Sequence, residues 1–178
     1  MTSPDPAQPG KQRLLCHLNN EGGQQEDVDI LPELSEEGYL KAYPEERRAR
    51  AFIEFCRQGD LEATLGVLQD EEEDELATDV LRYQDQLSEM QSTLQAAVVG
   101  GNENVAWLLL YLASDLPMDQ LPPILVEQAQ GMGLERGDTV GKPDVRGLKD
   151  LQGRNAENIA METQGPWMSW LGTGRLSL

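Results

Sequence analysis

The side chains best suited to chemistry are few in this chain and lie far apart. It has one histidine, His17, and two cysteines, Cys16 and Cys56. The sequence contains no CxxC, HExxH, G-x-S-x-G or G-x-x-x-x-G-K-[ST] pattern, so it gives no support to a transition-metal site, a serine hydrolase or a P-loop nucleotide site. We predict no catalytic residue, no cofactor, no metal and no enzyme activity. An enzyme or small-molecule binder stays open as an alternative, because it needs only a pocket with convergent polar groups.

Carboxylates are the abundant reactive groups. Asp and Glu number 32 against 14 Lys and Arg, which gives a net charge of −18. Such a chain repels phosphate backbones and anionic membranes, so we expect no nucleic acid and no membrane as partners, and the charge favours a basic protein. Six consecutive acids occupy residues 70–75, without the alternating ligand spacing of an EF-hand. This run is either a solvated loop or a docking strip for Lys and Arg of a partner. Its candidate contact residues are Glu71, Glu72, Glu73 and Asp74.

The cysteines and the length of the apolar runs indicate the cellular compartment of the protein. Two cysteines far apart in the sequence make no disulfide framework, and Cys56 in the apolar run A-F-I-E-F-C is expected to be a buried free thiol. No apolar run approaches the ~18 residues of a membrane span, and the N-terminal residues lack the apolar stretch of a signal peptide. We expect a cytoplasmic or nuclear protein.

Helical periodicity begins near Glu45 and is absent before it. Residues 1–40 are rich in Pro, Gln, Gly and acids, and they bury too little apolar surface to offset the entropy of ordering. We predict a disordered acidic arm there, and a frayed tail at 172–178. Between them, apolar residues recur at i, i+3, i+4 and i+7 in several short stretches broken by glycine. The predicted helices are 45–57, 60–69, 93–99, 103–113, a segment from Pro122-Pro123 to Gly131 or Gly133, and a last pair within 150–171.

Residues 92–110, S-T-L-Q-A-A-V-V-G-G-N-E-N-V-A-W-L-L-L, resemble the ankyrin repeat. The family pattern is T-P-L-H-x-A-A-x-x-G-H-x-x-V-V-x-L-L-L, and Leu94, Ala97, Gly101 and Val105 fall in register with it. The segment D-L-Q-G-R-N-A at 150–156 is similar to the turn that leads into an ankyrin first helix. By that resemblance Gly153 takes the turn position, Asn155 the helix cap and Ile159-Ala160 the packed face.

The resemblance covers residues 45–171 and implies the fold class. We expect an all-α, ankyrin-type helix-pair solenoid of three to four degenerate repeats with a disordered N-terminal arm. The units would be 47–69, 92–115, a degraded 117–147 and 150–171. One such unit cannot bury its apolar face alone, so the units are expected to stack on one another.

Ankyrin proteins bind partners through first helices and hairpin tips, and this resemblance maps Ala96 and Val99 to the binding surface. Trp107 and Tyr111 lie at i and i+4 on a predicted second helix. They are either exposed interface residues or packed between neighbouring helix pairs. The implied function is a non-enzymatic protein–protein interaction module, an adaptor or regulatory scaffold, acting as a monomer. The alternative is an acidic escort for a basic protein such as a ribosomal protein or histone.

Overall fold

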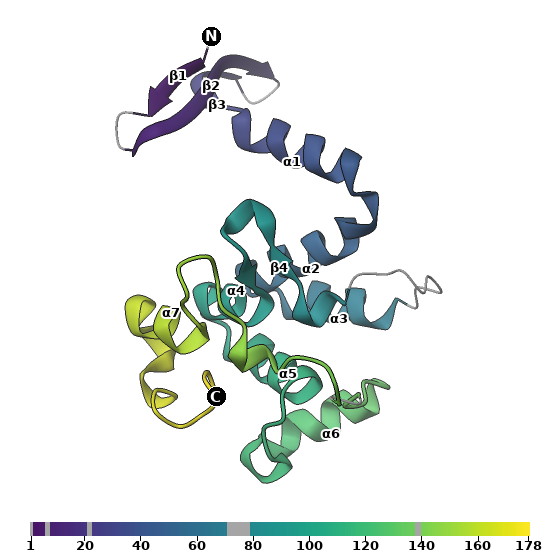
Figure 1. Ribbon diagram of the computed structural model, residues 1–178. Helices are drawn as coiled ribbons and strands as arrows, with labels where there is room; N and C mark the ends of the chain where they lie inside the picture. Colours follow the sequence, from purple (N-terminus) through teal and green to yellow (C-terminus); the bar gives the residue numbers. More distant parts are fainter. Residues whose placement is uncertain (1, 6–7, 21–22, 71–78, 138–139) are drawn as a thin grey trace. The chain divides into compact units, whose positions relative to one another are not determined.

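A computed structural model describes residues 2–5, 8–20, 23–70, 79–137 and 140–178 (Figure 1). The chain divides into two compact units, residues 1–44 and 45–178, and each is treated by itself below. The described residues are mostly helical, in agreement with the predicted all-α class, although they also include strands, one of them 13 residues long.

The first unit contains a three-stranded antiparallel sheet and one helix, where the sequence predicts a disordered arm. The strands are β1 (Thr2–Asp5), β2 (Gln8–Asn20) and β3 (Gly23–Asp29), in the order β1-β2-β3, followed by α1 (Leu31–Ala42). The prediction considered only the apolar surface available for burial. An antiparallel ladder also pairs backbone N–H and C=O groups, and composition carries no sign of this pairing.

The second unit contains the remaining elements. Its α-helices are α2 (Arg47–Gln58), α3 (Leu61–Gln69), α4 (Thr93–Gly100), α5 (Glu103–Ala113), α6 (Pro123–Gly131) and α7 (Ala156–Thr163). Its short 3-10 helices are η2 (Val80–Arg82), η3 (Gln86–Ser88), η4 (Met118–Gln120), η5 (Val145–Gly147) and η6 (Gly165–Ser169), while η1 (Pro44–Glu46) joins the two units. A small hairpin pairs β4 (Gln84–Asp85) with β5 (Gln91–Ser92).

The predicted breaks between helices are confirmed, and local chemistry explains them. Gly59 ends α2 and Gly101 ends α4, each at φ +70°, a left-handed conformation that glycine adopts without steric cost. The Asp60 side chain then accepts the N–H of Ala63, and Asn102 caps α5 in the same way. In each pair, a glycine in the left-handed conformation ends the first helix, and a polar side chain caps the start of the second.

The predicted entry into α7 is also confirmed. Gly153 takes the turn at φ +76°, and the Asn155 side chain accepts the N–H of Asn158 while Asn158 returns a bond to the Asn155 N–H. This reciprocal arrangement is a capping box, and Ser92 forms one with Gln95 at the start of α4.

Helix α4 packs between α2 and α7, and α5 packs behind it (Figure 1). The approach of α2 to α4 is close at Gly100, where an added Cβ would lie 2.6 Å from the Arg57 carbonyl oxygen. The core gathers around this row. Its largest fully buried side chains include Phe52, Ile53, Leu94, Leu109, Leu110, Tyr111, Leu116 and Trp167.

Segment 117–147 differs from the predicted third repeat. Helix α7 lies beside α4 in the row, whereas α6 contacts α5 (Figure 1). Within α6 only Ala129 is fully buried, although every residue of that helix is described. Ile124 is 70% exposed. The three apolar residues 124–126 are consecutive, so their side chains point in different directions around α6 and cannot all face α5.

The predicted frayed tail at 172–178 is wrong. Leu176 is fully buried, and its carbonyl oxygen accepts the N–H of Glu157 at 3.2 Å. Periodicity could not reveal this, because the tail is held by single contacts to other elements rather than by a helix of its own.

Candidate interaction surface

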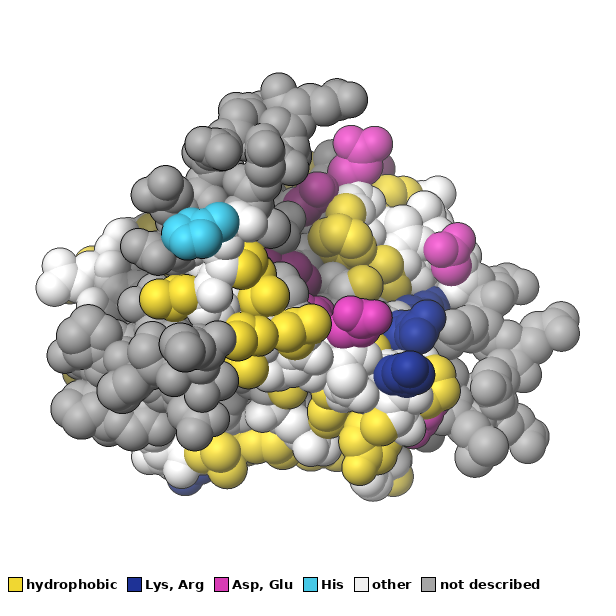
Figure 2. Space-filling model, turned by 90° about the horizontal axis from the view of Figure 1, so that it is seen from above, with side chains coloured by type: hydrophobic (Ala, Val, Ile, Leu, Met, Phe, Trp, Pro, Cys, Tyr) yellow, Lys and Arg dark blue, Asp and Glu magenta, His cyan; other side chains and the backbone are white. Residues whose placement is uncertain are grey.

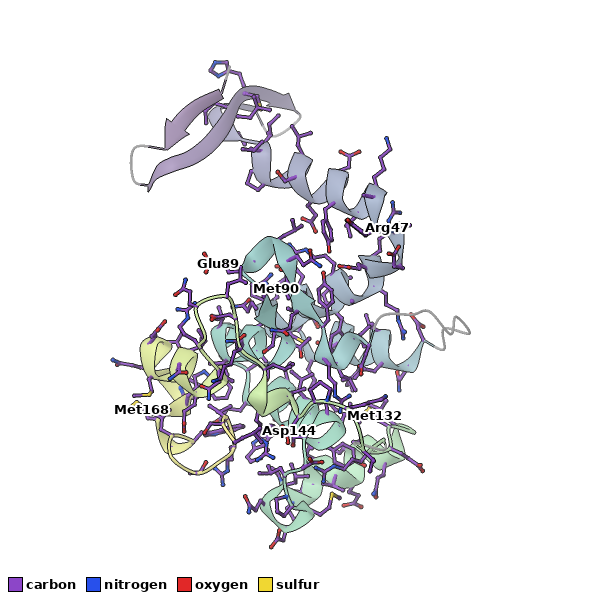
Figure 3. The ribbon with its side chains drawn as sticks, viewed as in Figure 1. Arg47, Glu89, Met90, Met132, Asp144 and Met168 are labelled. Carbon is purple, nitrogen blue, oxygen red and sulfur yellow. The ribbon has the colours of Figure 1, made fainter. Side chains whose placement is uncertain are left out.

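An open apolar groove of about 290 Å³ lies among α3, α5 and α6. Figure 3 shows Met132 beside α6, where it forms part of the lining. We call this surface the groove. Its lining residues are Leu61, Leu65, Glu103, Asn104, Trp107, Leu108, Pro122, Ile124, Leu125, Gln128, Ala129 and Met132.

The lining is apolar with few polar groups. Among the described residues that line the groove, Glu103 is the only charged one, and it accepts a hydrogen bond from the Trp170 Nε1–H at 3.1 Å. The volume is at the lower end of the ~300–1,000 Å³ typical of small-molecule sites. This groove therefore suits one or two apolar side chains of a protein segment better than a large cofactor.

All three tryptophans of the chain pack against one another, and one of them, Trp107, also lines the groove. The ring centroids of Trp107 and Trp170 are 4.3 Å apart, and Trp167 meets Trp170 edge-on at 5.1 Å. The Trp167 Nε1–H donates to the Val98 carbonyl oxygen at 2.8 Å. We call these three residues the tryptophan cluster; it joins the end of α4 and the side of α5 to η6.

The structure separates the two predicted aromatic residues. Trp107 is half-buried. It packs on Trp170 and also lines the groove, so it is partly packed and partly exposed, and both predicted alternatives apply to it. Tyr111 is 1% exposed, and its hydroxyl donates to the Leu134 carbonyl oxygen at 3.3 Å. Tyr111 therefore takes the packed alternative and is not available as a partner contact, because the segment after α6 covers it.

The two predicted residues of α4 also differ. Ala96 is 0% exposed, so it cannot contact a partner; α4 has helices on both sides, and a small side chain permits that approach. Val99 is 45% exposed at the end of the same helix and stays available. The acidic residues 71–74 lie outside the described residues.

A buried carboxylate that sequence reasoning missed fixes the hairpin of β4 and β5. Asp85 is fully buried and accepts hydrogen bonds from Arg50 at 2.7 Å and from Arg57 at 3.3 Å. It also accepts the Leu87 N–H, and Arg57 donates to the Gln91 side chain. Arg50 and Arg57 both come from α2, so only the three-dimensional contact distinguishes Asp85 from the other acids of the chain.

The tip of that hairpin has a tight backbone. Glu89 and Met90 have φ values of +55° and +60°, which are uncommon for residues with side chains (Figure 3). The Leu151 N–H donates to the Glu89 carbonyl oxygen at 2.9 Å, so the hairpin tip and the turn before α7 lie side by side. Leu151 itself is exposed.

The carboxylate of Asp144 connects the end of segment 117–147 to Asp115, just after α5, and forms an ion pair with Arg146 of the same segment. Asp144 accepts hydrogen bonds from the Arg146 side chain at 2.6 Å and from the Asp115 N–H at 2.7 Å (Figure 3). Burial alone would raise the pKa of Asp144, but these hydrogen bonds and the Arg146 charge hold it below its usual range.

The remaining reactive groups are separate from one another. Burial raises the pKa of the Cys56 thiol to about 12, which leaves it protonated and confirms the predicted buried free thiol. His17 is exposed (Figure 2). Within the described ranges, no three or more His, Cys, Asp or Glu residues gather to hold a metal ion, and no helix is long and apolar enough to cross a membrane.

Comparison with known proteins gave no match. No family model, no curated protein and no solved structure matches this chain.

Sequence reasoning missed the groove as a site, although one signal pointed to it. Ile124, Leu125 and Val126 give α6 more apolar surface than one packed face requires. Such an excess indicates a second apolar contact, and in the structure Ile124 and Leu125 line the groove.

Proposed function

We propose that this protein is a non-enzymatic protein–protein interaction module, an adaptor or regulatory scaffold. Its body would be an ankyrin-type stack of three helix pairs, α2–α3, α4–α5 and α7–η6. This proposal is supported by the row of α2, α4 and α7 and by the left-handed glycines at 59 and 101. Segment 117–147 would then be an insertion between the second and third units.

The groove is the observation that carries the proposed function. It leaves apolar side chains of three helices open to solvent, with a single carboxylate among the described lining residues. Exposed apolar surface in a concave site typically marks an interaction site. A partner segment that inserts one or two apolar side chains would bury this surface, and its affinity would depend little on salt.

A second function is favoured by the net charge of −18. An acidic escort for a basic protein would recruit its partner by long-range attraction, and binding would weaken as salt screens the charges. The two functions therefore differ in salt dependence and in the residues that they need.

Affinity purification of the tagged chain from its own cell extract, at low salt and at ~0.5 M salt, tests both functions. Ile124→Glu places a charge in the groove at an exposed position, and Met161→Glu is the matched control on α7, also exposed. A partner retained at high salt, lost in Ile124→Glu and kept in Met161→Glu supports the interaction module. A partner that Ile124→Glu retains as well as the wild type does contradicts the role of the groove.

Two further variants separate the remaining surfaces. Neutralising residues 70–75 to Asn and Gln should release an escorted basic partner and leave a groove partner bound. Val99→Glu tests the exposed end of α4. If a partner survives neutralisation and high salt, the escort function is excluded.

We also propose a monomer located in the cytoplasm or nucleus. Light scattering coupled to size-exclusion chromatography measures the mass directly, and a tagged chain in cells reports the compartment. A stable dimer or an exported protein would contradict this proposal.

A further inference from the structure

Residues 172–177, which we call the tail segment, are held by side chains from elsewhere in the fold. Glu157 is the main contact. Its Oε1 accepts the Gly172 N–H at 2.6 Å, its Oε2 accepts the Ser177 hydroxyl at 2.8 Å, and its own N–H donates to the Leu176 carbonyl oxygen at 3.2 Å. One residue of α7 thus binds the tail segment at three positions.

Two further contacts fix the middle of the tail segment. The Arg146 Nη1 donates to the Gly174 carbonyl oxygen at 2.9 Å. The Arg175 guanidinium lies over the indoles of Trp107 and Trp170, at 5.1 and 5.7 Å from the ring centroids, within the range of cation–π contacts. Leu176, the next residue, is fully buried.

The tail segment has no helix or strand of its own and, like a bound peptide, is held by contacts from other elements, with Leu176 as its one member of the hydrophobic core. Its contacts come from α5, η5, α7 and Trp170 just after η6, and it supplies an arginine and a leucine to the sites that these form. Gly172 and Gly174, both beyond the end of η6, have φ values of +69° and +75°, so the tail segment begins with two left-handed turns that glycine adopts without steric cost. Such a segment can detach without unwinding a helix.

The binding site of the tail segment is continuous with the groove. Trp107 lines the groove and also lies under Arg175. Glu103, the charged residue of the groove, accepts the hydrogen bond of Trp170, the second indole under Arg175. A segment lying in the groove would therefore place a neighbouring cation on the same aromatic surface.

We propose that the site formed by Trp107, Trp170 and Glu157 recognises an arginine–leucine segment of a partner protein, and that the tail segment is its internal occupant. This inference rests on the proposed interaction function and names the chemistry of the partner. Two observations support a foreign partner: the site already accommodates a guanidinium and a leucine, and the net charge of −18 attracts segments that carry arginine.

Because the tail segment occupies the site, it determines the affinity that a partner needs in order to bind there. A tethered segment competes at an effective concentration in the millimolar range, so a partner must bind well enough to displace it. Only one guanidinium can cover the two indoles at a time. Removing the side chains of Arg175 and Leu176 should consequently open the site to a peptide added in solution.

The test uses the full chain with Arg175→Ala and Leu176→Ala, and the acetylated peptide GTGRLSL as the probe. The tryptophan cluster provides the signal, because peptide binding covers Trp107 and Trp170 and shifts their fluorescence. We expect the opened variant to bind GTGRLSL about tenfold more tightly than GTGALSL, as the loss of a cation–π contact predicts. The wild-type chain should bind GTGRLSL at least about tenfold more weakly than the opened variant does.

Controls keep this proposal falsifiable. Thermal unfolding first checks that the opened variant is folded; if it is not, Arg175→Ala alone, which keeps Leu176, takes its place. A folded variant that binds neither peptide, or binds both equally, overturns the proposal. Wild-type dimers that the opened variant lacks would also overturn it, because they would assign the site to the tail segment of a second copy.

The outcome is distinguishable from that of the proposed function. If the peptide binds and Ile124→Glu still captures the partner, the proposed role of the groove is contradicted, but the proposed arginine site is supported. Loss of capture in Ile124→Glu without peptide binding would leave the interaction function intact and remove only the arginine site.

Discussion

Helices α5 and α6 contact each other, are both rich in apolar residues and differ greatly in burial. Eight of the eleven residues of α5 are buried, whereas α6, whose nine residues are all described, buries Ala129 alone. Helix α5 lies behind α4 and is covered on its other side by α6 and the segment that follows it. Helix α6 contacts α5 on one side and leaves the rest of its apolar surface to the groove.

This contrast teaches that apolar content alone does not separate core from binding surface. The number of neighbouring elements determines whether an apolar helix belongs to the core or to a binding surface. Helix α5 has neighbours on several sides, whereas α6 packs on one side of α5 only. We therefore expect stability to depend on the row of α2, α4 and α7 with α5, and partner binding to depend on α6.

The largest expected effect compares one apolar residue from each helix. Leu109→Ala in α5 removes a fully buried side chain and should cost about 2–5 kcal/mol of unfolding free energy, because it leaves a cavity. Ile124→Ala in α6 should change it by less than about 0.5 kcal/mol. Urea unfolding followed by far-UV circular dichroism measures both. Equal losses would mean that α6 is as much a part of the core as α5.

The next effect concerns the attachment of segment 117–147. Asp144→Asn removes the charge that Arg146 and the Asp115 N–H bind, and should cost about 1.5–3 kcal/mol at neutral pH. Because folding lowers the pKa of Asp144, its contribution is complete above the unfolded pKa and is lost as the pH falls through the acid range.

Unfolding free energy measured from pH 7 to pH 2 checks the sign of this prediction. The wild type should lose more stability than Asp144→Asn over that range. Asp119→Asn, at an exposed position of the same segment, is the control. A variant whose acid sensitivity equals that of the wild type would show that Asp144 does not hold the segment.

Two helix-terminal glycines offer a matched pair. Gly100→Ala in α4 would place a Cβ at 2.6 Å from the Arg57 carbonyl oxygen and 2.8 Å from that of Cys56, and should cost about 1–3 kcal/mol, since backbone must move. Gly131→Ala in α6 meets no atom within 4 Å and should be neutral or stabilise by up to ~1 kcal/mol, as Ala favours helix. Thermal unfolding compares them, and a stable Gly100→Ala would contradict the close contact between α2 and α4.

The smallest effect concerns the cap of α5. Asn102→Ala should cost about 1 kcal/mol, because it leaves the N–H groups of Asn104 and Val105 without their side-chain acceptor. Asn102→Asp keeps that acceptor and loses only the donor to the Gly59 carbonyl oxygen, so it should restore part of the loss. If Ala and Asp destabilise equally, the bond to Gly59 rather than the cap is what matters.

Local rules predicted the local structure well. The sequence places α5 at Glu103–Ala113 and a cap at Asn155, and the structure has both. Hydrophobic spacing, a left-handed glycine and a capping side chain are each determined within about one turn of chain, so the residues themselves carry the information.

Contacts between distant segments were not predictable in the same way. Ala96 and Val99 share one helix, and only the positions of α2 and α7 show that the first is covered and the second exposed. Tyr111 is covered by residues more than twenty positions later, and the groove exists because α6 stands apart from the row. None of these pairings leaves a periodic signal in the sequence.

The buried thiol of Cys56 has a consequence for spectroscopy. The chain has two cysteines, one in each unit, and a thiol-reactive dye needs the thiolate. With a pKa of about 12 and no exposed surface, Cys56 should remain unlabelled in the folded protein while Cys16 reacts. All three tryptophans lie in the second unit, so energy transfer from them to a dye on Cys16 would measure the distance between the two units without a single mutation.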